Sequence, residues 1–207
     1  MKQSGLNLMA GGLLLLGLSA SQGMALDLGA KMPSADLKMT NAVGKSMSLA
    51  DIKGKEGALV IFTCNHCPFV KAWQDRMVKI ANTYAAKGVG VAFVNANDPV
   101  AIPEDDLDHM RQLAETKGYT FPYLMDETSA VAHAFGATRT PEAFLFDKDG
   151  KLVYHGTIDD STYDAAKVTK PYVENALAEL VAGKAISEPE TKSVGCTIKF
   201  RPNAEKP

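Results

Sequence analysis

The chain has 207 residues, of which 46% are hydrophobic, and a formal net charge of −2. This size and apolar content suffice for one globular domain with a buried core. No run of basic residues stands out, so we expect no nucleic-acid partner. No linker, repeat or low-complexity tract divides the sequence, which indicates a single domain.

Residues 1–25 have the layout of a secretory signal peptide. Lys2 is the only charged residue among them, an apolar run covers about 8–18, and small residues follow up to a candidate cleavage site after Ala25. The apolar run is too short to span a bilayer comfortably, and the alternative is an uncleaved anchor or a buried helix. We therefore expect a periplasmic or secreted bacterial protein that has no membrane attachment after cleavage.

The next segments predict a strand–helix–strand unit. Residues 35–53 predict two short strands around a turn, and 57–64 are a continuous apolar run typical of a buried strand. Residues 68–88 carry apolar side chains at helical spacing and end at a glycine, and 89–98 predict a second buried strand. The segment Cys-Asn-His-Cys, residues 64–67, therefore falls at the first strand-to-helix turn.

Helices and strands continue to alternate after this unit. We predict a helix over about 105–117, a strand over 121–126, a short helix over 128–137, a hairpin over 140–159 and a final helix over about 168–183. The single domain covers 26–207, with a core of about 35–183 and a tail at 184–207 that shows no periodicity.

Several polar side chains near these elements are interpreted as structural. The acids at the start of the helix at 105–117 predict a solvated helix start that complements the helix dipole: Glu104, Asp105, Asp106 and Asp108. His155, on a strand of the predicted hairpin, is interpreted as a packing residue.

The mature chain contains three cysteines, Cys64, Cys67 and Cys196. Export would allow disulfides to persist, but a protein stapled for stability usually carries an even and denser set. A Cys-x-x-Cys pair is also half of some metal sites. Three cysteines, two of them in Cys-x-x-Cys spacing, fit redox chemistry better.

The predicted helix gives the two cysteines different roles. Cys64 would lie at the helix N-terminus, where unpaired amide groups and the dipole favour a thiolate, and it would be the exposed attacking thiol. Cys67, one turn deeper, would resolve the mixed disulfide. His66 would donate a hydrogen bond or a positive charge toward the Cys64 sulfur, which favours the reduced state and makes the disulfide more oxidising.

Six stretches span most of 57–200 in this order: "FTCNHCPFVKAW", "NANDP" followed by "PEDD", "YTFPYLMDETSAVAHAFGATRTPEAFLFD", "KLVYHGTIDDS" and "GCTIKF". In these stretches the sequence resembles the thioredoxin-fold superfamily, and specifically its peroxiredoxin-like (AhpC/TSA, redoxin) branch. The Cys-x-x-Cys alone is moderately specific. Its combination with the Thr-Pro strand and the Gly-Cys-x-Ile-Lys tail is much more so.

The resemblance implies a thioredoxin-like α/β fold, with a central mixed β-sheet flanked by helices, an N-terminal hairpin and a C-terminal tail. It implies that Cys64 and Cys67 are the redox pair and that Pro141 follows a cis peptide bond, an ordinary trans proline being the alternative. In such a layout the backbone of Thr140 is free to pair with an incoming extended chain. No cofactor and no metal site is expected.

Three functions remain open. The favoured one is an exported thiol–disulfide oxidoreductase that acts on thiol or disulfide proteins and is recycled by a redox partner. The alternative is a peroxiredoxin-like thiol peroxidase. Typical members of that group resemble the pattern Pro-x-x-x-Thr-x-x-Cys, whereas this chain has Gly57 in place of the proline and Ile61 in place of the threonine. The third is a metal-binding chaperone using the cysteines and His66. Cys196 is a possible third redox thiol, or a small buried residue under the tail.

Overall fold

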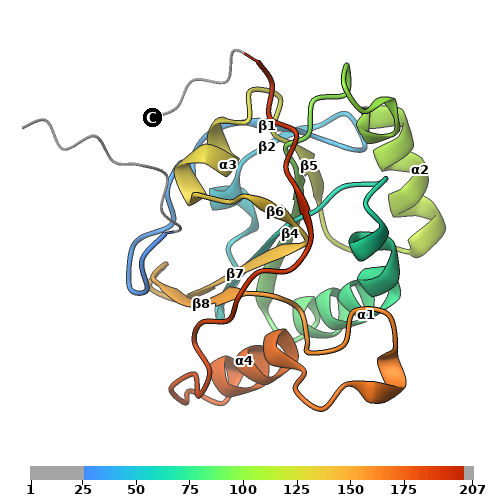
Figure 1. The fold of residues 1–207 in the computed structure, drawn as a ribbon. Helices are drawn as coiled ribbons and strands as arrows, with labels where there is room; N and C mark the ends of the chain where they lie inside the picture. Colours follow the sequence, from blue (N-terminus) through green and yellow to red (C-terminus); the bar gives the residue numbers. More distant parts are fainter. Residues whose placement is uncertain (1–25, 203–207) are drawn as a thin grey trace, which may run out of the picture.

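The computed structural model describes residues 26–202, so the predicted signal peptide lies outside the described residues. A seven-stranded mixed sheet in the order β2-β1-β5-β4-β3-β7-β8 forms its centre (Figure 1). The strands are β1 (Met39–Asn41), β2 (Ser46–Met47), β3 (Gly57–Phe62), β4 (Val89–Asn95), β5 (Tyr123–Met125), β7 (Glu142–Asp147) and β8 (Leu152–Gly156). The predicted central mixed sheet and the N-terminal hairpin of β1 and β2 are confirmed.

The central strands explain the continuous apolar run in the sequence. β3 pairs in parallel with β4 on one side and antiparallel with β7 on the other, and all six of its residues are buried. Leu59 and Ile61 point into the core on one face of the sheet, whereas Val60 and Phe62 point into the core on the other. A strand with apolar neighbours on both faces has no polar positions, which is why the run does not alternate.

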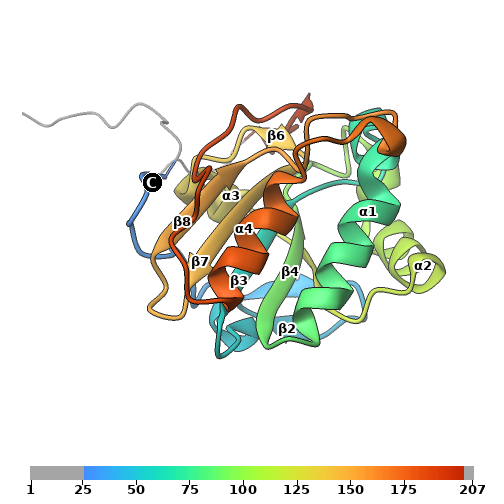
Figure 2. The ribbon, with the colours of Figure 1, turned by 90° about the horizontal axis from the view of Figure 1, so that it is seen from below.

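Helices cover both faces of the sheet. α1 (Pro68–Ala85) and α4 (Tyr172–Val181) lie side by side on one face, and α2 (Leu107–Lys117) also packs into that core (Figure 2). α3 (Ala130–Phe135) and the 3-10 helix Leu49–Ile52 pack on the opposite face. No helix within residues 26–202 is long and apolar enough to cross a membrane.

The C-terminal tail forms a strap across one end of the sheet (Figure 1). Its short strand β9 (Cys196–Thr197) pairs antiparallel with β6 (Arg139–Thr140), so that Thr140 faces Cys196. Further along, Ile198 is 6% exposed and joins the core. We call residues 189–201 the strap. The expectation that the backbone of Thr140 is free for an incoming chain is therefore wrong in this structure, because the strap already pairs with it.

Candidate active site

The two cysteines lie beyond the carboxyl end of β3, where ligand sites of parallel sheets form. Cys64 follows β3 by two residues, and Cys67 is the N-cap residue of α1. Both side chains are buried, each 0% exposed. Two expectations are therefore corrected: Cys64 is not the exposed thiol, and Cys67 lies at the start of the helix rather than one turn inside it. Pro68 begins the helix, so the residue before it is held in extended conformation.

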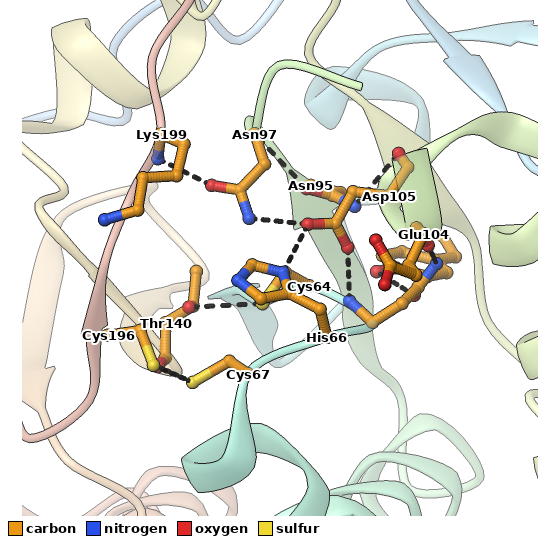
Figure 3. Close-up of polar contacts among 12 residues, drawn as sticks. Cys64, His66, Cys67, Asn95, Asn97, Glu104, Asp105, Thr140, Cys196 and Lys199 are labelled. Atoms are coloured by element: carbon orange, nitrogen blue, oxygen red, sulfur yellow. Dashed lines mark hydrogen bonds and ion pairs between the residues drawn. The ribbon is translucent and has the colours of Figure 1, made fainter. Parts of the chain in front are cut away.

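Thr140 contacts both sulfurs. The Thr140–Pro141 peptide bond is cis, as expected, and it lies opposite the Cys-x-x-Cys turn. Cys64 Sγ lies 3.3 Å from the hydroxyl oxygen of Thr140, and Cys67 Sγ lies 3.3 Å from its carbonyl oxygen (Figure 3). One residue thus holds both thiols of the pair against the end of the sheet.

The surroundings divide the charge unequally between the two thiols. A hydrogen bond from the Cys64 thiol holds the pKa of Cys67 well below its ordinary 9.0, against the effect of burial, and Cys196 and the backbone amide of Val70 add to this. The N-terminal end of α1 also favours an anion at Cys67. The pKa of Cys64 is raised by its bond to Cys67, by burial and by the nearby Asp105. In the reduced pair these influences therefore favour negative charge on Cys67 over Cys64.

A buried carboxylate anchors the turn between the cysteines. Asp105 is 0% exposed. Its oxygens accept hydrogen bonds from the backbone amide of Asn65 at 2.6 Å and from the side-chain amide of Asn97 at 2.7 Å. The Nδ1 atom of His66 lies 2.7 Å from the same carboxylate (Figure 3).

These contacts correct two expectations. The acids near α2 do not share one solvated role, because Asp105 is buried at the site, whereas Asp106 caps α2 and Asp108 is exposed. His66 was expected to bond toward the Cys64 sulfur, but the hydrogen bond of its Nδ1 atom goes to Asp105.

Hydrogen bonds continue from Asp105 to the strap. The side-chain oxygen of Asn97, whose amide group bonds Asp105, accepts the backbone amide of Lys199 at 2.7 Å. The backbone amide of Asp98 in turn donates to the carbonyl oxygen of Lys199 at 2.7 Å. The loop after β4 therefore connects the Cys-x-x-Cys turn to the C-terminal strap.

The third cysteine joins the pair through the strap. Cys196 Sγ lies 2.6 Å from Cys67 Sγ (Figure 3). Burial and the neighbouring Cys67 raise the pKa of Cys196 to about 11. The backbone approach here is close, since a Cβ atom on Gly195 would lie 2.2 Å from the carbonyl oxygen of Thr140. All three cysteines of the chain therefore meet around Thr140.

A second buried carboxylate directly follows the cis-proline. Glu142 accepts the backbone amides of Thr138 and Arg139, each at 2.8 Å, and its other oxygen lies 2.7 Å from His155 Nε2. The hydroxyl of Ser193, in the strap, donates to that same oxygen at 3.0 Å. Burial alone would raise the pKa of Glu142, but these hydrogen bonds outweigh it and the pKa is lowered. His155 thus helps to hold the segment before Pro141, beyond simple packing.

One group of side chains is close enough to share a cation. A sulfur of Cys64, a ring nitrogen of His66 and a carboxylate oxygen of Asp105 all lie within 4.8 Å of one another. Each already has a protein partner, namely Thr140 for Cys64, and Asp105 and His66 for each other.

Sequence reasoning found the three cysteines, His66, Thr140 and Pro141, and the structure brings all of them together. It missed Asp105, Asn97 and Glu142 as parts of the site. The stretches "NANDP" and "PEDD" hold the first two and belong to the family resemblance, so they carried a signal. Glu142 follows the cis-proline directly, at the start of a strand that is expected to be buried. A buried carboxylate needs hydrogen-bond partners, and this requirement was a second signal that Glu142 is part of a polar network.

Comparisons with known proteins indicate the family to which the chain belongs. Residues 27–177 match the Redoxin family. The thiol-disulfide oxidoreductase ResA of Geobacillus thermodenitrificans is 28% identical over 128 residues, which are 62% of this chain and 68% of that protein. The crystal structure of an uncharacterised conserved protein from Geobacillus kaustophilus is 41% identical, with a TM-score of 0.80 over 86% of this chain and 94% of that chain.

A more distant structure supports the fold. The thioredoxin domain of a thiol-disulfide oxidoreductase from Bacteroides vulgatus superposes with a TM-score of 0.52 at 22% identity, over 63% of this chain and 89% of that chain. The expected thioredoxin-like fold is therefore confirmed. The family match and the ResA relatives identify the protein as an oxidoreductase. Since the family match spans well over half of the sequence, the chain belongs to the Redoxin family.

Proposed function

We propose that the protein is an exported thiol–disulfide oxidoreductase whose redox pair is Cys64 and Cys67. The observation that carries the proposal is the position of the two thiols. Cys67 stands at the N-cap of α1, Cys64 precedes it by three residues, and Thr140 of the cis Thr-Pro bond contacts both. An anionic sulfur beside a second thiol is the arrangement that disulfide exchange requires.

The charge distribution sets the order of attack in this proposal. The Cys67 thiolate attacks one sulfur of a substrate disulfide and forms a mixed disulfide, and the other substrate sulfur leaves as a thiolate. Cys64 then loses its proton and attacks Cys67, which closes the Cys64–Cys67 disulfide and releases the second substrate thiolate. In this direction the pair acts as a reductant, and a redox partner must return two electrons to it; oxidation of a substrate dithiol runs the same steps in reverse, and the partner then takes two electrons from the pair. This order reverses the roles that the sequence alone predicts.

Reduction of insulin disulfides, and oxidation of a reduced protein substrate, test the proposal. With Cys196→Ser added to remove the third thiol, we expect both Cys64→Ser and Cys67→Ser to abolish turnover. In that background Cys64→Ser should accumulate a mixed disulfide with the substrate, whereas Cys67→Ser should not, because only Cys67 attacks. Asp108→Asn, on the exposed side of α2, is the matched control and should keep full turnover. Full activity in Cys64→Ser would show that the pair is not the redox centre.

The reduction potential of the pair decides the direction of electron flow. Stabilising the Cys67 thiolate favours the reduced dithiol, so we expect a potential more oxidising than that of thioredoxin, about −270 mV, and closer to about −120 mV. Equilibration with glutathione or dithiothreitol buffers, followed by alkylation of free thiols, measures it. A value at or below that of thioredoxin would contradict the assigned thiolate stabilisation.

Peroxide reduction is the alternative activity, and the site favours it less. Ile61, where a peroxidase would carry threonine, is buried in β3 and points into the core. The Cys64 and Cys67 sulfurs also belong to buried side chains, and Cys196 of the strap lies against the sulfur of Cys67. We expect hydrogen peroxide turnover no faster than that of a free thiol. Rapid turnover with a thiol reductant would favour the peroxidase instead.

The export part of the proposal depends on residues 1–25. We expect bacterial cells that express the full chain to release a periplasmic or secreted form that begins at Leu26, which intact-mass measurement after cell fractionation would detect. A protein that retains these residues in the cytoplasmic fraction would contradict export without affecting the proposed chemistry.

A further inference from the structure

We propose that the strap is a built-in substrate strand, in which Cys196 exchanges with the Cys64–Cys67 disulfide to form a Cys67–Cys196 disulfide that closes the site. The inference rests on the proposed function, because the Cys64–Cys67 disulfide is the oxidant for this step. It adds an internal substrate and a regulatory state to the pair.

The strap lies where an extended substrate would bind. An exposed strand edge can bind an extended chain by adding it as a further strand through main-chain hydrogen bonds. Here β9 makes that pairing with β6, and Cys196 is the register partner of Thr140. The Ile198 amide adds a hydrogen bond of 3.0 Å to the carbonyl oxygen of Thr138. The groups that an incoming chain would use are therefore occupied by this chain itself.

The sulfur of the strap also lies where the sulfur of a substrate must be. A mixed disulfide at Cys67 needs a second sulfur about 2.05 Å away. Cys196 Sγ is 2.6 Å from Cys67 Sγ and belongs to the strand that pairs beside the cis-proline. Cys64 instead faces the hydroxyl of Thr140. The geometry therefore selects the pair of Cys196 with Cys67, rather than with Cys64.

Other contacts hold the strap in this register. The hydroxyl of Ser193 donates to Glu142, the Arg139 guanidinium donates to the Gly195 carbonyl oxygen at 3.2 Å, and Lys199 bonds Asn97 through its backbone amide. These contacts lie on both sides of Cys196, so the cysteine is positioned by its neighbours and not by its own side chain alone. Such positioning gives an intramolecular thiol a high effective concentration.

The exchange balances within the chain. Cys196 loses its proton, and its sulfur attacks the Cys67 sulfur of the Cys64–Cys67 disulfide. The bond between the sulfurs of Cys67 and Cys196 forms while the bond between those of Cys64 and Cys67 breaks. The electron pair of the broken bond goes to the Cys64 sulfur, which takes up a proton. No external oxidant or reductant enters the step.

The free thiol left after a two-electron oxidation reports this exchange. Wild-type protein is treated with one equivalent of diamide, quenched in acid, alkylated and digested with trypsin. The peptide 56–71 carries Cys64 and Cys67, and the peptide 193–199 carries Cys196. We expect alkylation at both Cys64 and Cys196 across the population, with Cys67 always oxidised, and a linked peptide pair. Alkylation at Cys196 alone, without a linked pair, would overturn the inference.

Single variants identify the sulfur that the strap uses. With the same treatment, Cys64→Ser should give the linked peptides in nearly every molecule. Cys67→Ser should give a yield of linked peptides at least about tenfold lower, which corresponds to a preference of about 1.4 kcal/mol for the Cys67–Cys196 disulfide over a Cys64–Cys196 disulfide. Equal yields in both variants, or no link in Cys64→Ser, would contradict the assigned pair. This readout uses no external substrate, so it can succeed or fail independently of the insulin assay.

Displacing the strap without changing a thiol tests its role as a competitor. Gly195→Val adds atoms against the carbonyl oxygen of Thr140, whereas Val194→Ala, one residue earlier and 37% exposed, is the matched control. We expect Gly195→Val to lower the yield of linked peptides about tenfold and to raise the rate of insulin reduction about tenfold. Each change corresponds to weakening the binding of the strap at the site by about 1.4 kcal/mol. An unchanged rate of insulin reduction in a variant whose linked peptides are lost would show that the strap does not compete with substrates.

Discussion

The assignment of the thiolate to Cys67 gives the sharpest prediction of the site. Replacing one of the two cysteines at a time should separate the titration of the Cys64 thiol from that of the Cys67 thiol. In reduced wild-type protein at neutral pH we expect about one thiolate, whereas an ordinary cysteine is ionised to only a few per cent. Cys67→Ser should lose this thiolate almost completely, because the remaining Cys64 is buried and lies near Asp105, and both influences raise its pKa.

The magnitude for the partner variant follows from one hydrogen bond. Cys64→Ser changes the donor that contributes most to the low pKa of Cys67. A hydrogen bond to a charged group is worth about 1.5–3 kcal/mol, so losing it fully would raise the pKa of Cys67 by about one to two pH units. A serine hydroxyl that keeps part of the bond would give a smaller rise. The thiolate of Cys64→Ser should still form at a pH below the ordinary cysteine value.

Ultraviolet absorbance of the thiolate during a pH titration measures both variants, with Cys196→Ser added to each so that a third thiol does not contribute. The unfolding free energy gives a second readout. Because the folded pKa of Cys67 lies below its ordinary 9.0, the stabilisation from its thiolate is fully present above about pH 9 and is lost as the pH falls through the lowered value. A thiolate that persists in Cys67→Ser and disappears in Cys64→Ser would refute the reasoning.

Two further predictions concern stability, and urea unfolding measures both. Glu142→Gln should lower the unfolding free energy at neutral pH by about 2–4 kcal/mol, because His155 and two backbone amides lose a buried charged acceptor. Since the folded pKa of Glu142 is lowered, this loss should shrink as the pH falls from its ordinary 4.5 through the folded value, and a loss independent of pH would contradict the assignment. Gly90→Ala should cost about 3 kcal/mol or more, since its Cβ would lie 1.8 Å from the Ile52 carbonyl oxygen. Gly118→Ala, with open space but a φ of +66°, should cost only about 1–2 kcal/mol, and equal losses would refute the steric argument.

The long elements of the fold were predictable because the burial of their side chains requires a regular pattern of apolar residues in the sequence. β3 is apolar throughout, and β4 is apolar up to Asn95, since both faces of the sheet are covered, and α1 repeats its buried residues at helical spacing. The strands β6 and β9 were not predictable. Each has two residues, too few for any alternation, and their pairing joins segments 56 residues apart, Thr140 with Cys196.

The site was predictable where a local motif carries it and not where the partners are distant. The Cys-x-x-Cys spacing and the Thr-Pro pair are local, so sequence reasoning found them. Which acid near α2 turns inward is decided by the tertiary position of the loop after β4. Asp105 ends a 3-10 turn over the cysteines, whereas Asp106 faces the end of α2. The four acids look equivalent in the sequence, and only the fold separates them.

The position of Asp105 also explains why the predicted roles of the cysteines are exchanged. A helix start favours an anion, but a buried carboxylate nearby opposes one, and the two influences act on different sulfurs here. Asp105 lies on the side of Cys64 and raises its pKa, whereas the N-cap of α1 is Cys67. The sulfur that keeps the negative charge is then the one that Cys196 contacts. The carboxylate, the helix and the strap therefore all direct exchange to Cys67 and leave Cys64 as the thiol that closes or releases the ring.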